Sequence, residues 1–463
     1  MKVYLETFGC QMNRLDSELV IGSLRAAGHE MVCDRGQAQV VLYNTCSVRR
    51  HAEQKACSRL GAEAQRKQAR RGDLIIGVLG CMAQREGSGL RRQFPQVDIV
   101  CGPGRICDLP ELIAAAVAGR EAIALDPART EARDRPADQR TDRMDLDRDP
   151  APAGSSPHQA YVRVMRGCDN FCTYCIVPFV RGPERNRPPE HIVEEVRRLA
   201  GAGRGEITLL GQKVNSYLWR EGRTTVRFSD LLGRVSAVPS LRRLRFVTSH
   251  PADFSDDVLE AMRDLPNVCR YIHCPAQSGS DAVLKRMNRR YTRGQYDDLV
   301  DRARSIVPGV VLAGDFIVGF PGETEDDHQA SAELIRRSGY KNCFVFKYSP
   351  RPGTAAAERF ADDVPAEVKK RRNNELLAVQ QEVGLAHHRA YVGSEVEVLV
   401  EGPSPRSGKQ PHSPAPGSVQ LVGRTPGDHI VVFDGTQSLI GRYVTVKVTG
   451  ASSLTLFAAP QAG

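Results

Sequence analysis

The sequence predicts an α/β protein of three domains: a parallel α/β domain, a partial (βα)6 barrel and a small antiparallel β-barrel. Three observations predict this fold class. Short apolar runs alternate with helical patterns over the first 117 residues, and six further strand-like runs follow at βαβ spacing. The last part alternates hydrophobic and polar residues between glycine-rich turns. With 463 residues, 41% of them hydrophobic, the chain is long enough for several cores.

The N-terminal domain is expected over residues 1–117. Its apolar runs at 3–8, 40–43 and 74–79 indicate strands, and the periodic stretch 17–27 indicates a helix. Residues 118–157 are rich in Asp, Arg, Pro, Ala and Ser, with scarcely any large apolar side chain. Such a composition is typical of a linker.

The central barrel is expected over residues 158–383. Its strand candidates are 161–165, 207–210, 244–247, 270–273, 310–318 and 343–348. The C-terminal barrel is expected over 384–458, with strands at 394–400, 429–433, 443–448 and 454–457. Residues 403–418 form a Pro/Ser/Gly-rich insertion that cannot continue a strand, so we expect a mobile loop there.

Charge and cysteine content narrow the class of protein. The formal net charge of +9 suits a polyanionic partner without requiring one. No signal peptide and no run of about twenty apolar residues is found, so we expect a cytoplasmic protein with no membrane partner. Thirteen cysteines in a reducing compartment indicate metal or redox chemistry rather than disulfides. Nothing indicates an obligate oligomer, so we expect a monomer.

Cys168, Cys172 and Cys175 form a C-x3-C-x2-C run directly after a predicted strand of the central barrel, where barrel enzymes place their chemistry. A zinc ion or a cubane cluster held by protein alone needs four ligands. Three closely spaced thiolates therefore leave one metal position open for a cofactor or substrate. The intervening residues are poor zinc ligands, which makes zinc the weaker alternative.

A second set of three cysteines is spread through the N-terminal domain. Cys10, Cys46 and Cys81 each follow the carboxyl end of a predicted strand. Parallel sheets bind ligands at that edge, so these thiols are expected to converge into a second three-cysteine site. The alternative is that they are small core residues, as free cysteines often are. We prefer the core interpretation for the other seven cysteines.

Many ordered motifs together resemble a known family. They are ETFGCQMNRLDSE, NTCSVRRHAEQKA, GVLGCMAQR, RGCDNFCTYCIVPFVRGPERNRP, LLGQKVNSY, TSHP, HCPAQSGS, MNRRYT, DFIVGFPGETEDD and FKYSPRPGTAA. The C-x3-C-x2-C run resembles the radical S-adenosylmethionine (SAM) signature, and the whole chain is similar to the radical SAM methylthiotransferases. The resemblance implies that the C-terminal barrel is a TRAM domain, an RNA-binding module.

The resemblance also implies an activity: methylthiolation of carbon 2 of N(6)-isopentenyladenosine next to the tRNA anticodon. Two 4Fe–4S clusters, on the two cysteine sets, and two SAM molecules per turnover are implied. The cluster in the barrel would bind and cleave SAM to a radical that removes the adenine hydrogen, and the N-terminal cluster would carry the sulfur. Implied partners are the tRNA anticodon loop, an electron donor such as flavodoxin or ferredoxin, and iron–sulfur assembly proteins.

Other residues are candidates for cofactor and phosphate contacts. By resemblance, Tyr174 contacts the adenine of SAM, and the turn with Gly319, Gly322 and Glu323 lines the same cofactor. Two glutamines that end other strands suit polar cofactor or substrate groups, with turn capping as the alternative; they are Gln212 and Gln277. Three arginines after the cysteine run are candidates for phosphate contacts or for a solvated basic face; they are Arg181, Arg185 and Arg187.

Two alternative functions stay open. One lies within the same chemistry: a methylthiotransferase acting on threonylcarbamoyladenosine in tRNA, or on ribosomal protein S12. The other belongs to a different class: a non-catalytic iron–sulfur RNA-binding protein, whose clusters would not respond to SAM.

Overall fold

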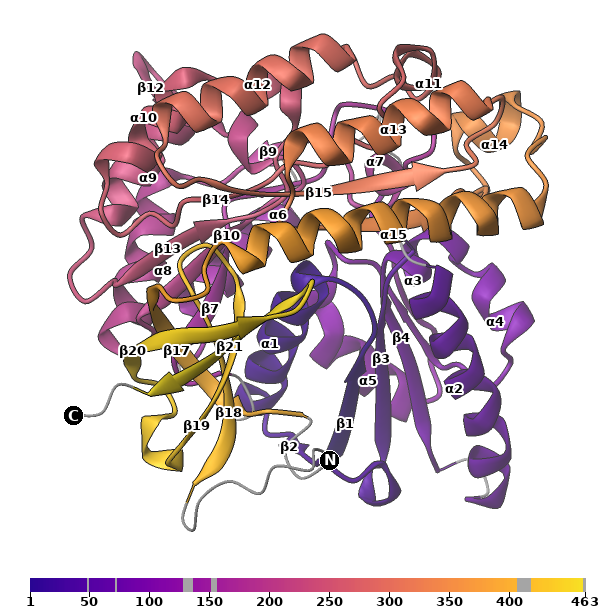
Figure 1. The fold of residues 1–463 in the computed structure, drawn as a ribbon. Coiled ribbons are helices and arrows are strands. Elements are labelled where there is room, and N and C mark those ends of the chain that lie inside the picture. The colour runs from indigo at the N-terminus through magenta and orange to yellow at the C-terminus, as the bar shows by residue number, and fades with distance from the viewer. Residues whose placement is uncertain (48–49, 71–72, 128–135, 151–155, 406–417, 461–463) are drawn as a thin grey trace.

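The computed structural model describes residues 1–47, 50–70, 73–127, 136–150, 156–405 and 418–460. An N-terminal α/β domain, a central α/β core and a C-terminal β-barrel follow one another along the chain, as predicted (Figure 1). Across these ranges, no helix is both long enough and apolar enough to cross a membrane.

The N-terminal domain is a six-stranded, fully parallel sheet in the order β2-β1-β3-β4-β5-β6. The strands are β1 (Lys2–Thr7), β2 (Glu30–Met31), β3 (Val40–Thr45), β4 (Ile75–Gly80), β5 (Ile99–Cys101) and β6 (Ala122–Ala124). The helices are α1 (Gln11–Ala26), α2 (Arg50–Ala69), α3 (Cys81–Glu86), α4 (Gly89–Gln93) and α5 (Leu109–Val117). The predicted strands and the predicted helix are all present.

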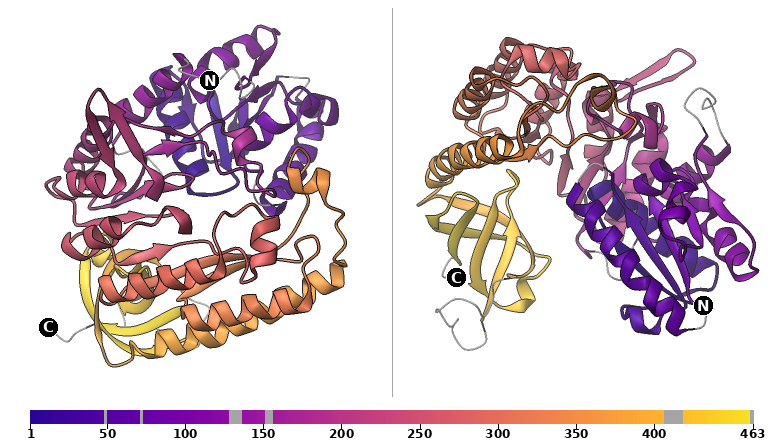
Figure 2. Two further views of the ribbon diagram at one scale, coloured as in Figure 1. Left: turned by 90° about the horizontal axis from the view of Figure 1, so that it is seen from above. Right: turned by 90° about the vertical axis from the view of Figure 1, so that its right-hand side faces the viewer.

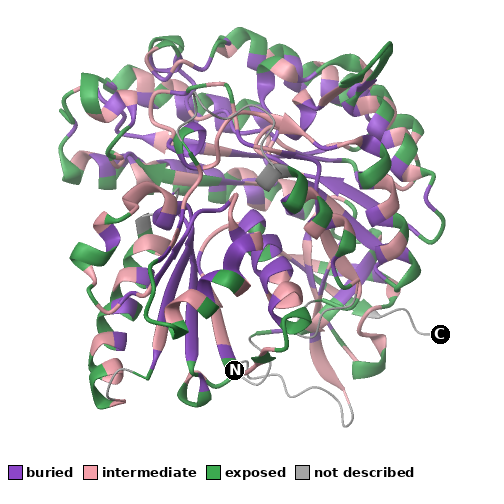
Figure 3. Ribbon diagram, turned by 180° about the vertical axis from the view of Figure 1, so that it is seen from behind, coloured by how far each residue is buried: buried purple, intermediate pink, exposed green. Residues whose placement is uncertain are grey.

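Both faces of this sheet are covered, which explains why its strands are continuous apolar runs (Figure 3). Leu42 and Ile99 pack with α1 and α5 on one face. Tyr43 and Val78 pack with α2, α3 and α4 on the other face. The carboxyl ends of the central strands consequently meet at one edge, the edge at which parallel sheets bind ligands.

The central core consists of two three-stranded parallel sheets, β7-β10-β13 and β14-β15-β16, joined through a bridge between Leu244 and Val268. These six strands confirm the predicted partial barrel; they are β7 (Gln159–Arg163), β10 (Glu206–Leu210), β13 (Arg243–Phe246), β14 (Tyr271–His273), β15 (Val311–Val318) and β16 (Asn342–Lys347). Two small hairpin-like pairs were not predicted: β8 (Met165–Arg166) with β9 (Arg185–Asn186), and β11 (Leu218–Glu221) with β12 (Thr224–Arg227).

Helices cover the outer side of the core, and the longest one runs along it towards the C-terminal barrel (Figures 1 and 2). They are α7 (Val177–Val180), α8 (Pro189–Gly201), α9 (Phe228–Ser236), α10 (Asp256–Asp264), α11 (Asp281–Arg286), α12 (Arg293–Ile306), α13 (Glu325–Ser338), α14 (Ala355–Arg359) and α15 (Ala366–Arg389). The apolar faces of most of these helices form one large core with the strands, whereas α7 packs against Cys81 of the N-terminal domain and α14 belongs to a smaller cluster.

The segment predicted as a linker is more ordered than its composition indicates. Residues 118–157 contain β6, which is the edge strand of the first sheet, and α6 (Pro136–Asp147), which contacts α8 and α1. Asp145 of α6 is fully buried and accepts hydrogen bonds from Arg163 at 2.7 and 3.1 Å. Some charges of this segment, whose composition is typical of a linker, therefore form buried ion pairs with the core.

Replacing Asp145 by Ala is expected to lower the free energy of unfolding by about 3–5 kcal/mol, because it leaves the buried Arg163 guanidinium short of a partner. The matched control is Asp147→Ala in the same helix. Its ion pair with Arg143 joins side chains that are 59% and 82% exposed, and such pairs contribute less than about 1 kcal/mol. Urea unfolding followed by circular dichroism measures both variants. Equal losses would contradict the structural role of the buried pair.

The C-terminal barrel is closed, in the order β17-β18-β19-β21-β20. Its strands are β17 (Glu395–Pro403), β18 (Val419–Arg424), β19 (Ile430–Gly435), β20 (Tyr443–Ala451) and β21 (Thr455–Pro460). Strand β18 was not predicted. The pairs are antiparallel, as expected, except for β19 with β21. Five strands in a closed ring cannot all alternate in direction, so one parallel pair is unavoidable. The predicted mobile loop at 403–418 lies, from 406 to 417, outside the described residues.

The barrel packs against the amino ends of the core strands. Arg243 and Arg245 of β13 donate hydrogen bonds to carbonyl oxygens of the barrel turn at Arg424 and Thr425. Lys341, just before β16, pairs with Asp428 at 2.7 Å. The opposite, carboxyl ends of the core strands remain for the cysteine loop.

Candidate functional site

The three cysteines of the N-terminal domain lie together at the carboxyl edge of its sheet, as predicted. Cys10 follows β1 and caps α1, Cys46 follows β3, and Cys81 begins α3 directly after β4. The side chains of Cys10 and Cys46 are hydrogen-bonded, and Cys81 interacts electrostatically with Cys10. Cys46 and Cys81 are buried. Strands from separate parts of the sequence thus gather these thiols at one place.

Two glycines and an asparagine pair let the chain approach so closely at this edge. Gly9 has φ +148°, and a Cβ there would lie 2.7 Å from Cys46 Cβ. Gly80 has φ +88°, and a Cβ there would lie 2.5 Å from a backbone oxygen of β3. The buried Asn13 amide donates to Asn44 Oδ1 at 3.0 Å, which ties the start of α1 to the end of β3. Glycine before cysteine is therefore required by the site's geometry.

The barrel cysteines form the second site on the loop after β8. Cys175 donates its backbone N–H to the Cys172 carbonyl at 2.9 Å, and the side chains of all three cysteines interact electrostatically. Thr173, between them, donates to the carbonyls of Met287 and Arg286 and accepts from the Ala356 N–H at 2.7 Å. The loop is consequently fixed to the C-terminal end of α11 and to the start of α14.

The environment shifts the pKa of several thiols. The hydrogen bond with Cys46 lowers the pKa of Cys10 to about 5, against the effect of burial. Burial raises the pKa of Cys81 and Cys168, and it raises the pKa of Cys175 to about 12. Thiolates are the form that binds metal, so metal binding at either site is coupled to the release of protons.

In neither set do the sulfur atoms lie as close together as the ligands of a single zinc ion. A tetrahedral zinc ion with Zn–S bonds of about 2.3 Å brings its sulfur ligands to within about 3.8 Å of one another. Among the residues that the structure describes, one group of His, Cys, Asp or Glu side chains has all its ligand atoms within 4.8 Å, and it contains no cysteine. Both donor sets therefore fit a multi-iron cluster with three thiolate ligands better than zinc.

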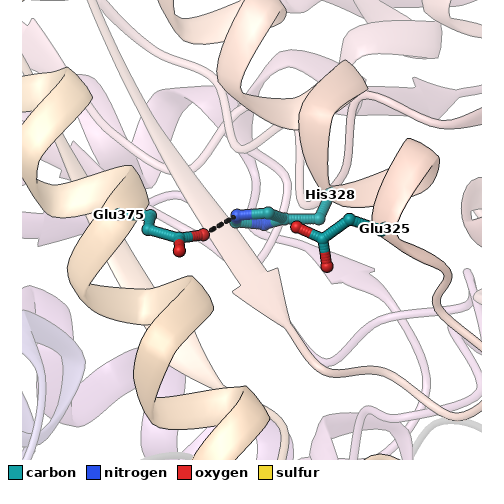
Figure 4. Close-up of side chains that lie close together, drawn as sticks. All are labelled: Glu325, His328 and Glu375. Atoms are coloured by element: carbon teal, nitrogen blue, oxygen red, sulfur yellow. Dashed lines mark hydrogen bonds and ion pairs between the residues drawn. The ribbon is translucent and has the colours of Figure 1, made fainter.

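That one group, Glu325, His328 and Glu375, is an ion-pair network (Figure 4). His328 Nε2 lies 2.8 Å from Glu375 Oε2. Arg371 bonds to both carboxylates, at 2.7 Å to Glu325 and 2.9 Å to Glu375, and Arg372 lies 3.3 Å from Glu325. Because these arginines already neutralise the charge of both carboxylates, the group is not expected to bind a metal ion.

The two cysteine sites adjoin each other. Cys81 packs in one buried cluster with Ile176 and Val180, which lie directly after Cys175 and at the end of α7. Helices α3 and α7 are in contact across the boundary between the domains. One short helix therefore separates the two sets of thiols.

Comparisons with known proteins agree with this arrangement. Three family models match in succession: Uncharacterized protein family UPF0004 over residues 2–102, the Radical SAM superfamily over residues 162–335, and the TRAM domain over residues 389–460. A relative from Rhodopirellula baltica is 46% identical over 455 residues, covering 98% of this chain and 94% of its own length. It is named tRNA-2-methylthio-N(6)-dimethylallyladenosine synthase. The chain belongs to the radical SAM methylthiotransferase family.

Further relatives carry the same synthase name. One from Phocaeicola vulgatus is 44% identical and one from Syntrophotalea carbinolica is 42% identical, covering 98% and 97% of this chain and 95% and 97% of their own lengths. Among solved structures, the radical SAM methyltransferase TsrM from Kitasatospora setae, with cobalamin and a 4Fe–4S cluster bound, aligns with a TM-score of 0.54. At 15% identity, covering 77% of this chain and 74% of that one, it shows a shared fold.

The other residues predicted for the radical SAM domain lie at the carboxyl ends of its strands. Tyr174 packs edge-on to Phe320 with ring centroids 6.5 Å apart. Gly319 has φ +68°, and the buried Glu323 carboxylate accepts its N–H at 2.9 Å and a bond from Arg372 at 2.8 Å. The Glu323 side chain therefore closes the turn that contains both glycines, including Gly322 at φ +73°.

The two predicted glutamines have different settings. Gln277 has φ +70°, donates its N–H to Asp315 and accepts from Ile317, so its backbone extends the sheet beyond β14. Gln212 is half-buried in the turn after β10. Backbone pairing therefore holds Gln277 in place at the carboxyl ends of the strands.

Two of the three arginines fit neither expected role, that of a phosphate contact or that of a solvated basic face. The side chains of Arg181 and Arg187 are 8% and 1% exposed. Arg181 pairs with Asp16 at 3.0 Å and Arg187 with Glu195 at 2.7 Å. Burial and internal ion pairs therefore keep both from solvent and from RNA. Arg185 lies in the short strand β9.

Three further residues of the site were not predicted. Arg289, within the MNRRYT motif, is buried, and its Nη1 lies 3.6 Å from Cys172 Sγ. Phe344 and Phe346 stack with centroids 6.3 Å apart and planes at 22°, and they are 51% and 38% exposed. Their neighbours Cys343 and Val345 pack against the outer helices, so the phenylalanines face the interior of the open barrel. The alternation in NCFVFK, which places both phenylalanines on one face of the strand, is the sequence feature that could have predicted them.

Proposed function

We propose that this methylthiotransferase acts on carbon 2 of N(6)-isopentenyladenosine next to the tRNA anticodon, using two SAM molecules for each product. The observation that carries the proposal is the packing of Cys81 against Ile176, the residue after Cys175, in a chain whose relatives are named for this product. A sulfur source and a radical source must both reach one adenine. The two cysteine sites are separated by one short helix, so both can lie near the same base.

In this proposal each cysteine set holds one 4Fe–4S cluster. Cys168, Cys172 and Cys175 hold the cluster that binds SAM, and the N-terminal cysteines hold the cluster that supplies sulfur. Three thiolates leave one iron of each cluster without a protein ligand. Together the cofactors supply the one-electron chemistry that replaces an unactivated C–H hydrogen, which acid or base side chains cannot do.

The residues around the barrel cysteines would receive SAM. Tyr174 of the cysteine loop packs against Phe320 in the turn with Gly319 and Gly322, and glycine at positive φ lets the backbone approach a ligand. Glu323 holds this turn in place through Arg372. Two strand-end glutamines would bind polar groups of cofactor or substrate; they are Gln212 and Gln277.

Substrate binding would use the interior of the barrel. The exposed, stacked rings of Phe344 and Phe346 offer an apolar surface for an adenine and its isopentenyl group. Single-stranded anticodon loops let such a base turn outward at low cost. The TRAM domain would hold another part of the tRNA, because it packs on the far ends of the core strands.

The proposal extends to partners and location. An electron donor such as flavodoxin or ferredoxin would reduce the SAM-binding cluster, and iron–sulfur assembly proteins would load both sites. We propose that the enzyme works as a cytoplasmic monomer.

The test is an anaerobic assay of the reconstituted protein with SAM and a reductant, against three substrates. These are tRNA bearing isopentenyladenosine, tRNA bearing threonylcarbamoyladenosine, and ribosomal protein S12. Mass spectrometry is expected to find the 2-methylthio product with the first substrate alone. Product with either other substrate would replace the proposed substrate. An absorption spectrum unchanged by SAM, with no 5′-deoxyadenosine, would instead favour a non-catalytic iron–sulfur protein.

A further inference from the structure

Arg181 belongs to the radical SAM domain but lies against the cysteines of the N-terminal domain. It is the C-cap of α7, six residues after Cys175. Its guanidinium interacts electrostatically with both Cys81 and Cys10, and the residue before it, Val180, packs directly against Cys81. The loop that carries one set of thiols thus delivers a positive charge to the other set.

Asp16 of α1 holds this guanidinium in place. Its Oδ2 accepts from Arg181 at 3.0 Å, and its Oδ1 accepts from Arg163 at 2.8 Å. Arg163 is bound in turn by Asp145 of α6. The side chains of Asp16, Arg163 and Asp145 are each at most 1% exposed. Arg181 therefore cannot swing to solvent without breaking a buried network that joins both domains.

The charge of Arg181 has a clear consequence for a cluster at this site. A cluster held by three thiolates is negatively charged, and each added electron increases that charge. A buried cation beside the ligand sulfurs stabilises the more reduced state, because the surrounding dielectric is low. Removing the cation must therefore make the cluster harder to reduce.

We propose that Arg181 is a positioning residue that sets the reduction potential of the N-terminal cluster from across the domain boundary. The inference rests on the proposed function, since it requires that Cys10, Cys46 and Cys81 hold a cluster. Asp16 is the residue that orients Arg181 for this role.

The test uses the full chain in which Cys168, Cys172 and Cys175 are replaced by Ala, so that the N-terminal cluster is observed alone. Arg181→Gln removes the charge, Arg181→Lys keeps it, and Arg163→Gln breaks the Asp16 network without touching a cysteine. Each reconstituted protein is assayed for iron and titrated with dithionite, followed by electron paramagnetic resonance.

The expected result is a shift of the cluster potential to more negative values in Arg181→Gln, a smaller shift in Arg181→Lys and the smallest in Arg163→Gln. Loss of iron in Arg181→Gln, with iron retained in Arg181→Lys, would equally support a role for the positive charge of Arg181 at the cluster. Equal potentials in all four proteins, or loss of iron in all three variants, would overturn the inference and leave the proposed function standing. A parent protein without iron would overturn the two-cluster assignment, and this inference with it.

Discussion

Replacing Cys172 by Ala is expected to reduce 5′-deoxyadenosine formation more than about 100-fold, and to abolish the 2-methylthio product. Loss of a residue that only supports a metal ligand typically costs 10–100-fold, so loss of a ligand should cost more. Cys172 is 9% exposed, and its Sγ lies 3.6 Å from Nη1 of the buried Arg289. The measurement is 5′-deoxyadenosine by mass spectrometry after anaerobic turnover.

The matched control for this variant is Cys343→Ala. Cys343 is also buried in the radical SAM domain, but its side chain packs into the core with the outer helices. The control should keep 5′-deoxyadenosine formation within about twofold, because it removes one small core group and no ligand. Similar losses in both variants would show that Cys172 acts through folding and not through the cofactor.

Replacing Cys46 by Ala is expected to separate the two halves of the reaction. The variant should still form 5′-deoxyadenosine, because the barrel cysteines remain, while the 2-methylthio nucleoside falls more than about 100-fold. Iron content should fall by about half. Nucleoside analysis and iron assay of the same preparation measure both effects.

Cys101→Ala is the control in the N-terminal sheet. Cys101 ends β5 at the same edge and is fully buried, but its thiol contacts backbone oxygens of Gly102 and Arg105. It should keep both products and the full iron content. If Cys46→Ala retained methylthiolation, sulfur would not come from a cluster on the N-terminal cysteines.

Much of the fold and of the two cysteine sites could be predicted from the sequence. Apolar runs ending in cysteine place Cys10, Cys46 and Cys81 at one edge, because parallel strands of a sheet share their carboxyl ends. The three cysteines of the second run are close together in the sequence, so a single loop is enough to bring their thiols together. Glycine before Cys10 and Cys81 reflects the close backbone approach that the edge demands.

The long-range charge network could not be predicted from the sequence. Asp145 stands in an Asp/Arg-rich segment whose composition is typical of solvated chain, yet each of its oxygens is buried against arginine. Arg181 was interpreted as a candidate for a phosphate contact or for a solvated basic face, because nothing in its local sequence reveals Asp16, which lies 165 residues away. Whether a charged side chain is buried depends on the partner that the tertiary structure places beside it, and the local sequence does not identify that partner.

Strand β18 was missed for a related reason. The Pro-rich insertion before it separates β18 from β17, its partner in the barrel, so the hairpin pattern is interrupted in the sequence. The parallel pairing of β19 with β21 follows only from closure of the barrel.

The most direct test of the account is the iron and sulfide content of three full-length proteins reconstituted together. These are the parent chain, the variant with Cys10, Cys46 and Cys81 replaced by Ala, and the variant with Cys168, Cys172 and Cys175 replaced by Ala. The account predicts about eight iron atoms per chain in the parent and about four in each variant. It also predicts that SAM changes the electron paramagnetic resonance spectrum only in proteins that retain Cys168, Cys172 and Cys175. About four iron atoms in the parent, all lost from one variant and all kept in the other, would contradict the two-cluster enzyme.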